Sequence, residues 1–459
     1  PSDAAVAGRL LIVLHHLVVD GVSWRILLPD LAEAWKQVRD GKSPKLPATG
    51  TSVRRWTHAL LDEARNPARI AEMDLWRSVL DGPDPVLGSR PLDPAVDTRS
   101  ALDHIQLQLP VAVTEALLTR VPAAFHGGVN DGLLAALALA VAKWRRGRGV
   151  EESSTLIKLE GHGREQDVVP GADLSSTVGW FTSMFPVRLD TAGFDLDEAF
   201  AGGPAAGGVI KAVKEQLLAV PDKGLGFGLL RYLNEETAAE LAGHSTGQIG
   251  FNYLGRFSSA DMPENLRGLG FTQICEMAAP LDADMPAMSA LELNSMVIDT
   301  DLGAQLDVSA GFPAGLFAPE DVRELIELWF AALEALARHT ADPAAGGLTP
   351  SDLPLVKARQ HDIEAWENRY PGLSDVWPLT PLQSGLLFHT MLNDDSWDAY
   401  QMQMAFHIEG EVDPARMRAA AQALLDRHAN LRTAFVDDSD GNQVQVVVDG
   451  VEVPWQEID

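Results

Sequence analysis

Residues 10–28 read LLIVLHHLVVDGVSWRILL, a stretch that places two imidazoles, a carboxylate and a glycine after an apolar run. The run at 10–14 is short, continuous and rich in branched side chains, which predicts a buried strand closed by a turn at Asp20 and Gly21. Imidazole titrates near neutrality, so a histidine held there can act as acid or base, and the Asp20 carboxylate can fix its tautomer. A structural histidine–aspartate pair that satisfies a buried turn is the alternative interpretation.

Bulk composition narrows the class of protein. The chain has 459 residues, 46% of them hydrophobic, which predicts a globular protein of two or three domains. Its 36 basic and 65 acidic residues give a formal net charge of −29, which argues against nucleic-acid and anionic-membrane partners. The single Cys275 excludes an internal disulfide framework and a multi-cysteine metal site, and it fits a reducing cytoplasm. We expect a cytoplasmic protein, and the start at Pro1 suggests an internal piece of a longer chain.

Apolar periodicity predicts helices and strands in irregular alternation. Helices are expected over residues 23–38, with Ser23 as the cap, and over 52–80, 113–121, 131–144, 208–220, 318–339 and 414–428. Strands are expected over residues 104–109, 155–159, 178–189, 248–254, 291–300, 304–310 and 400–407. This order favours an α/β fold, an α+β layered sandwich, over a helix bundle.

Other site motifs are weaker. Residues 243–247, GHSTG, match the nucleophile-elbow pattern, but a helical stretch precedes them and a strand follows, the reverse of what that motif needs, so a loop is predicted. Residues 224–228, GLGFG, lack the spacing of a dinucleotide fingerprint. A metal site built from His162 and the polar residues of the opening stretch is chemically possible, but the spacing is not that of a known ligand pattern. We therefore expect no metal and no bound cofactor.

Glu160 is the second strong feature, because it stands where a strand meets the Gly-x-Gly loop of EGHGRE, residues 160–165. Backbone can approach a ligand closely at such a loop. A surface salt-bridge cluster on a turn is the alternative. A histidine and a glutamate on different strand ends, facing one cavity, would form a two-base pair that removes a proton from one face of a carbon and returns one to the other.

Five motifs in order resemble the epimerization domain of nonribosomal peptide synthetases, and together they are far more specific than any one alone. They are HHLVVDGVSWRIL, EGHGRE, TVGWFTSMFPVRL, PDKGLGFGLLRYL and FNYLGRF. The resemblance covers residues 10 to about 355. The later WPLTPLQSGLLFH and RHANLRTAF resemble the opening motifs of a condensation domain.

The resemblance implies a chloramphenicol-acetyltransferase-like fold of two lobes with a tunnel between them. It implies an epimerization domain at 1–345, with the remainder of an incomplete N-terminal lobe at 1–100 and the C-terminal lobe at 101–345. A linker at 346–377 would lead to the N-terminal part of a condensation domain at 378–459, a partial second domain of the same type.

The implied reaction is epimerization of an L-aminoacyl or peptidyl thioester to the D form, by α-proton removal and return, in antibiotic or other secondary metabolite biosynthesis. The substrate would hang on the phosphopantetheine arm of a peptidyl carrier protein, so no cofactor is bound directly, and neighbouring synthetase domains are the other partners. His16 and Glu160 are the implied catalytic residues. The implied supporting residues are His15, Asp20, which would brace the turn, and Arg164, Asn252 and Tyr253, which would line the site.

Two other functions stay open. An amide-forming condensation domain shares the HHxxxDG motif and the fold but would use its histidine with an acceptor amine; EGHGRE and FNYLGRF argue against it. A noncatalytic carrier-docking module would be indifferent to His16→Ala and Glu160→Ala. Phe227 stands where the family usually has tyrosine, and we expect this exchange to be tolerated. The family's first motif is absent, so part of the N-terminal lobe is missing, and the isolated fragment is expected to fold poorly or to lack activity because an unpaired edge and apolar surface would be exposed.

Overall fold

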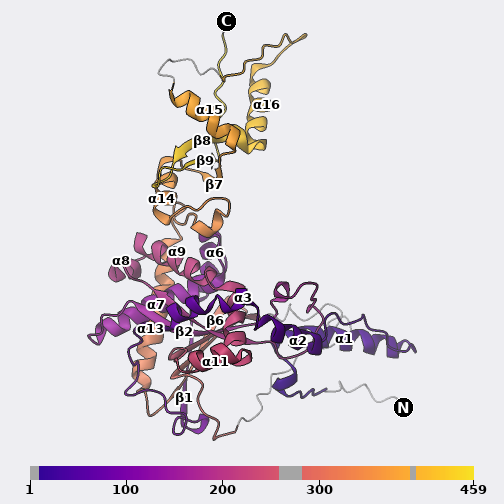
Figure 1. Ribbon diagram of the computed structural model, residues 1–459, viewed down its shortest axis with the longest axis vertical. Coiled ribbons are helices and arrows are strands. Elements are labelled where there is room, and N and C mark those ends of the chain that lie inside the picture. Colours follow the sequence, from indigo (N-terminus) through magenta and orange to yellow (C-terminus); the bar gives the residue numbers. More distant parts are fainter. Residues whose placement is uncertain (1–9, 258–281, 393–399, 459) are drawn as a thin grey trace. The chain divides into compact units, whose positions relative to one another are not determined.

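The computed structural model describes residues 10–257, 282–392 and 400–458 (Figure 1). The chain divides into two compact units. The first unit takes in residues 1–122 and 128–343, and the second takes in residues 123–127 and 344–459. The domain boundaries predicted at 345 and 377 stay predictions.

The first unit is built on a mixed sheet, which has six strands in the described residues, in the order β1-β6-β5-β4-β2-β3. The strands are β1 (Leu102–Gln108), β2 (Ser154–Gly161), β3 (Ser183–Asp190), β4 (Ile249–Phe257), β5 (Leu291–Thr300) and β6 (Gly303–Pro313). β4 runs parallel to both β2 and β5, and the other neighbours are antiparallel. The carboxyl ends of β2, β4 and β5 therefore lie at one edge of the sheet.

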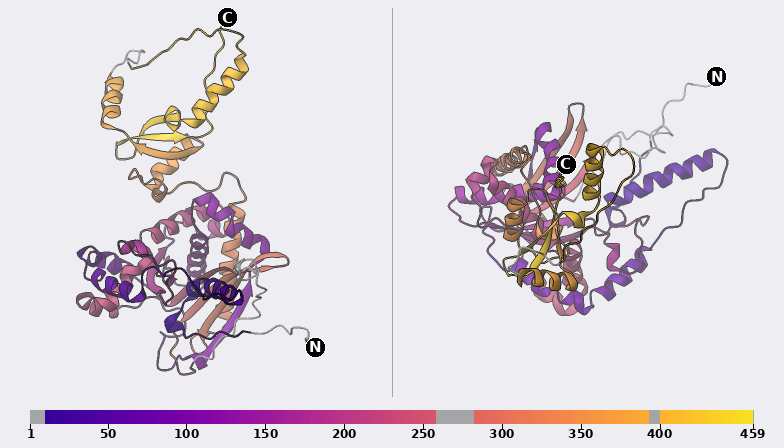
Figure 2. Two further views of the ribbon diagram at one scale, coloured as in Figure 1. Left: turned by 90° about the vertical axis from the view of Figure 1, so that its right-hand side faces the viewer. Right: turned by 90° about the horizontal axis from the view of Figure 1, so that it is seen from above.

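The predicted helices of this unit are present, and several begin or end a few residues from where periodicity placed them. The helices are α1 (Gly21–Arg39), α2 (Val53–Glu63), α3 (Pro67–Ile70), α4 (Met73–Leu80), α5 (Val111–Leu118), α6 (Arg120–Phe125), α7 (Val129–Gly147), α8 (Leu196–Ala201), α9 (Pro204–Leu218), α10 (Leu225–Gly228), α11 (Glu235–Ala242) and α13 (Pro319–His339). α1 projects from the rest of the unit, and only Ser23 and Ala32 of it are buried (Figure 2).

The two faces of the sheet differ in chemistry. Helices α7 and α13 pack against each other and against the sheet, and they cover its apolar face. On that face the Phe251 ring meets Trp329 of α13 at 5.9 Å, and the Trp329 indole donates to the Leu133 carbonyl of α7. No single helix of the described chain is long and apolar enough to span a membrane; one pair, 111–125 with 129–147, passes that test together but is bent by 100°.

The opposite side of the sheet, called the polar face below, follows from strand alternation and register. Its side chains include Gln106 and Gln108 of β1, Lys158 and Glu160 of β2, Asn252 of β4, Glu292 of β5 and Asp307 of β6, with Gly250 of β4 among them. Several are paired with one another: Gln106 and Gln108 both donate to the Asp307 carboxylate. The apolar core thus lies on one side of the sheet, and polar groups gather on the other.

Two predicted strands are wrong. Residues 10–14 form no strand, and their apolar side chains are exposed, Val13 by 78%. Residues 400–407 likewise lack strand pairing, and Met402 is 92% exposed. Alternating or continuous apolar residues make a strand only where a neighbouring strand supplies hydrogen bonds and a core covers one face. Within the described ranges neither segment has such a neighbour.

Smaller differences have local causes. α1 starts at Gly21, because the Asp20 side chain rather than that of Ser23 caps it, and the helix continues through Pro29. The helical stretch predicted at 52–80 is three helices, since Pro67 restarts the chain after an Asn66 cap. The strand predicted at 178–189 begins only at Ser183, and the residues before it form a loop.

The second unit holds a small antiparallel sheet, ordered β7-β9-β8, with three helices in its described part. The strands are β7 (Leu373–Pro378), β8 (Thr433–Asp437) and β9 (Gln443–Val448), and the helices are α14 (Gln360–Arg369), α15 (Pro381–Leu392) and α16 (Pro414–Arg427). Ile363 and Trp366 of α14 share a core with Val376 and Val446 of the sheet. Residues 346–377, predicted to be a linker, therefore contribute α14 and most of β7 to this core.

Candidate active site

Glu160 lies near the carboxyl end of β2, on the polar face. Its neighbour on β4 is Asn252, whose Nδ2 donates to the Glu160 Oε2 at 3.1 Å. The parallel register, in which Leu159 aligns with Phe251, places these side chains next to each other although they are 92 residues apart. An amide thus holds one of the two carboxylate oxygens.

The surroundings of Glu160 raise its pKa. Its side chain is accessible to solvent, but the crowding protein atoms withdraw water from it, and this burial is the main cause. The carboxylate of Glu292 raises the pKa further, whereas the charges of Lys158 and His16 lower it. A carboxylate whose pKa moves toward neutrality is a stronger base than an ordinary one.

His16 begins the short 3-10 turn η1 (His16–Val18) that precedes α1. Its ring meets the Trp180 ring edge-on, with centroids 5.2 Å apart. The His16 charge is the smallest of the four causes that set the pKa of Glu160, and it lowers that pKa. His15 has a local role instead: its Nδ1 accepts the Leu17 amide at 3.1 Å and caps the turn.

Asp20 is buried and caps α1. Its carboxylate accepts the backbone amide and hydroxyl of Ser23, at 2.7 and 2.8 Å, and the Phe181 amide at 3.2 Å, and it pairs with Arg164. Burial alone would raise the pKa of Asp20, but the hydrogen bonds from Ser23 and Arg164 outweigh it and hold the pKa below its usual value. The expectation that Asp20 fixes the tautomer of a neighbouring histidine is wrong, because these other donors occupy both of its oxygens.

Arg164 is buried beside Asp20 rather than turned toward a ligand. One guanidinium nitrogen donates to the Leu174 and Thr177 carbonyls, at 3.1 and 2.6 Å, and the group lies 4.2 Å from the centroid of the Phe181 ring. These bonds fold the connection between β2 and β3 back onto the start of α1. Arg164 was expected to line the site, and the structure places it beneath the site as an anchor of this loop.

Tyr253 is separated from the other predicted residues. It follows Asn252 as the last residue of β4 before a register shift, and it still aligns with the buried Ser295, so its side chain points to the face opposite Glu160. Burial raises the pKa of Tyr253. The structure thus places Glu160 and Asn252 in contact and leaves Tyr253 on the other side of the sheet.

Three residues near Glu160 or His16 have no assigned role in the sequence analysis. Lys158 stands two positions earlier on the same strand, so the period of two placed it on the face of Glu160 and would have revealed it. Trp180 lies in the TVGWF motif but carries no signal of contact with His16. Glu292 reaches the site from β5, and only the strand order reveals it.

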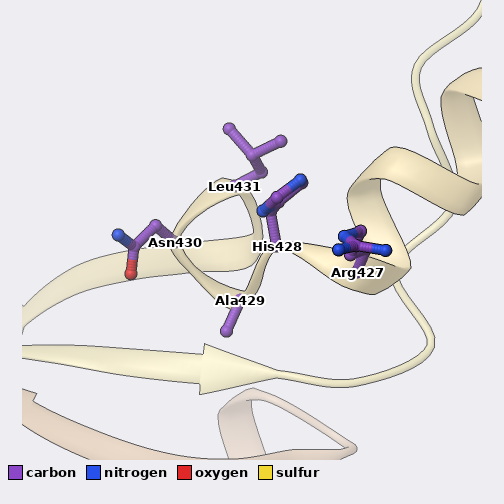
Figure 3. A pocket seen from close by; sticks show the side chains of 5 residues that line it. All are labelled: Arg427, His428, Ala429, Asn430 and Leu431. Atoms are coloured by element: carbon purple, nitrogen blue, oxygen red, sulfur yellow. The ribbon is translucent and has the colours of Figure 1, made fainter.

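A shallow pocket in the second unit is lined by five successive residues at the end of α16, Arg427, His428, Ala429, Asn430 and Leu431 (Figure 3). None of the predicted catalytic residues takes part in it. Across the described residues, no three His, Cys, Asp or Glu side chains gather as a metal site would need. The candidate site stays with Glu160 on the polar face.

Comparison with known proteins defines the class. A condensation domain model matches residues 4–353 and 373–459, so the chain belongs to the condensation domain family, which includes the condensation and epimerization types of nonribosomal peptide synthetases. The mixed α/β, chloramphenicol-acetyltransferase-like fold expected from the sequence is confirmed.

The relatives that the chain resembles in sequence are much longer synthetase polypeptides. The chain is similar to two linear gramicidin synthase polypeptides of Brevibacillus parabrevis, with 37% identity to one and 38% to the other, in each case over 98% of its own length. It spans only 6% and 8% of those proteins. Among solved structures it is similar to the epimerization domain from the third module of tyrocidine synthetase B, with 29% identity, a TM-score of 0.59, and coverage of 71% of this chain and 68% of that one.

Proposed function

We propose that this chain epimerizes the α-carbon of an L-aminoacyl or peptidyl thioester to the D form while the substrate hangs on the phosphopantetheine arm of a peptidyl carrier protein. The observation that carries the proposal is the Glu160 carboxylate, which lies on the polar face of the sheet and accepts a hydrogen bond from Asn252 Nδ2 at 3.1 Å. The likeness to a solved epimerization domain supports it.

In the L-to-D direction, ionised Glu160 accepts the α-proton, and the C–H electron pair passes into the enolate of the thioester. Protonated His16 then gives its proton to the opposite face of the same carbon, which restores the thioester with inverted configuration. The thioester carbonyl makes the α-hydrogen acidic enough for this transfer, and the raised pKa of Glu160 suits it to the task. The two groups end with their protons exchanged, so solvent must reset them, and the D-to-L direction uses the opposite roles.

The wider context of the reaction is part of the same proposal. Proton removal and return need neither a metal nor a redox cofactor, and the phosphopantetheine arm comes with the carrier. Residues 378–459 would begin the condensation domain that receives the D-configured product, and the neighbouring synthetase domains would be the partners, in the cytoplasm.

The test is α-proton exchange in deuterated water. The natural polypeptide that contains this chain, with its carrier loaded with an L-aminoacyl group, should incorporate α-deuterium and yield D product. His16→Ala and Glu160→Gln should each lose most of the exchange. The matched controls, His104→Ala on β1 and Asp307→Asn on β6, should keep it. A folded wild type without exchange, or catalytic variants that exchange normally, would contradict the proposal.

Amide formation is the second candidate, because the family that matches the chain is named for condensation. It predicts that a second carrier loaded with an acceptor amine yields a peptide product, and that exchange without the acceptor stays at background. If neither reaction occurs and neither variant changes carrier binding, the remaining interpretation is a noncatalytic docking module.

A further inference from the structure

An ion pair crosses the polar face beside Glu160. Lys158 Nζ lies 3.7 Å from Glu292 Oε1 and donates to the Met288 carbonyl at 2.8 Å. Lys158 is on β2 and Glu292 on β5, with β4 between them. The pair therefore spans a whole strand on the face that carries Glu160.

Gly250 makes this crossing possible. It aligns with Glu292 across the β4–β5 pair, and a Cβ at this position would lie 2.8 Å from the Glu292 Cδ and closer still to Oε2. Any side chain here would push the carboxylate away from Lys158. The glycine thus leaves the gap through which Glu292 reaches Lys158 and the neighbourhood of Glu160.

We propose that Lys158 and Glu292, meeting over Gly250, are a positioning pair that sets the charge of Glu160 for proton transfer. The role in proton transfer rests on the proposed function, whereas the geometry of the pair does not. The charged groups that face Glu160 are Lys158 from its own strand, Glu292 from β5 and His16 from η1, and Asn252 of β4 adds a neutral donor.

The two members of the pair act on Glu160 in opposite directions. Burial is the largest cause of the raised pKa of Glu160, and the Glu292 carboxylate is the second. The Lys158 ammonium lowers the same pKa. Burial in turn lowers the pKa of Lys158, and the Glu292 and Glu160 carboxylates oppose this. Removing Glu292 should therefore lower the pKa of Glu160, and removing the Lys158 charge should raise it. A merely structural pair would give no such opposite signs.

The experiment is a carbon-13 carboxyl titration of Glu160 in the substrate-free protein, with the signal assigned through Glu160→Gln. Glu292→Gln should shift the midpoint to lower pH, and Lys158→Met should shift it to higher pH. Gly250→Ala keeps every charge but displaces the Glu292 carboxylate, so it should shift the midpoint in the direction of Glu292→Gln. Asp307→Asn, which removes the buried Asp307 carboxylate elsewhere on the polar face, should leave the midpoint in place.

Midpoints that do not move, or that move the same way in Glu292→Gln and Lys158→Met, would overturn the inference; circular dichroism confirms that each variant is folded. The titration needs no substrate, so it separates this inference from the proposed function. If the midpoints shift in opposite directions but the protein shows no α-exchange, the proposed epimerase function is rejected and the electrostatic role of the pair is kept. If α-exchange occurs but the midpoints do not shift, the epimerase function is kept and the electrostatic role of the pair is rejected.

Discussion

The carboxylate of Asp20 and the guanidinium of Arg164 form a buried ion pair between residues 144 positions apart in the chain, with Nη2 at 3.0 and 3.2 Å from the two carboxylate oxygens. Their side chains are 4% and 8% exposed. Asp20 caps the helix that follows His16, and Arg164 anchors the loop that follows Glu160. The pair therefore fixes the segment of one candidate catalytic residue to that of the other.

Asp20→Asn should destabilise the first unit by about 3–5 kcal/mol, because it leaves the Arg164 charge buried without its partner. Since the folded-state pKa of Asp20 is lowered, its stabilisation is present above the unfolded pKa of about 4 and is lost as pH falls through the folded value. Urea unfolding at neutral and acidic pH should show the gap to wild type narrowing in acid. Glu240→Gln, which breaks the exposed pair with Arg77, should change the unfolding free energy little; an equal loss in both variants would refute the assignment.

Gly163→Ala should be far more damaging than Gly171→Ala. Both glycines have left-handed φ, +64° and +71°, so both substitutions incur the same backbone strain of about 1–2 kcal/mol. A Cβ at Gly163 would also overlap the Phe181 carbonyl, with its carbon at 2.7 Å, whereas nothing lies within 4 Å of a Cβ at Gly171. Thermal unfolding of both variants measures the difference, and equal melting temperatures would show that the loop yields freely at Phe181.

Trp180→Ala should slow α-exchange by about 2- to 10-fold, because an edge-on ring contact that holds His16 contributes about 0.5–1.5 kcal/mol. The matched control is Trp35→Ala on α1, since Trp180 is 52% exposed and Trp35 is 50% exposed. Single-turnover exchange rates of the two variants give the comparison. A loss of the same size in both would trace the effect to general surface perturbation.

In a profile of L-to-D exchange rate against pH, the rate should fall on the acidic side with a midpoint above the ordinary glutamate pKa of about 4.3. Ionised Glu160 is the proton acceptor in this direction, and its pKa is raised. This acidic fall is called the acidic limb below. Asn252→Asp puts a second carboxylate within hydrogen-bond reach of Glu160, which raises its pKa further and moves the limb to higher pH. Exchange rates across the acidic range, compared with Asn130→Asp at the exposed start of α7 as the control, measure the shift. A limb that stays in place in Asn252→Asp would assign the titration to another group.

Much of the fold follows from period and composition, because the elements concerned pack against partners inside the described chain. The helix predicted at 131–144 appears within Val129–Gly147, and the strands predicted at 291–300 and 304–310 appear as the β5–β6 hairpin. The strand predicted at 10–14 is absent because a strand needs a neighbouring strand to pair with. Its apolar residues indicate a strand, but they carry no information on whether such a neighbour is present.

The candidate site was predictable in part. Motif order predicted His16 and Glu160, and their catalytic roles stay proposals; the structure adds the contact of Glu160 with Asn252, which the motifs also named. The local sequence could not reveal that Arg164 turns inward to Asp20, because that contact joins distant segments. The position of Tyr253, in contrast, could have been predicted from the sequence. Side chains alternate along a strand, so Tyr253 must point away from the face of its neighbour Asn252.

The parallel alignment of β2 and β4 has an evolutionary corollary. Slipping β4 by one position would replace the amide beside Glu160 with an aromatic ring, from Phe251 or Tyr253, and would turn the glycine gap at 250 toward the helices. Selection should therefore eliminate insertions and deletions within this strand even where it tolerates substitutions. Descendants of this chain should differ from it in β4 by substitutions and not by strand length.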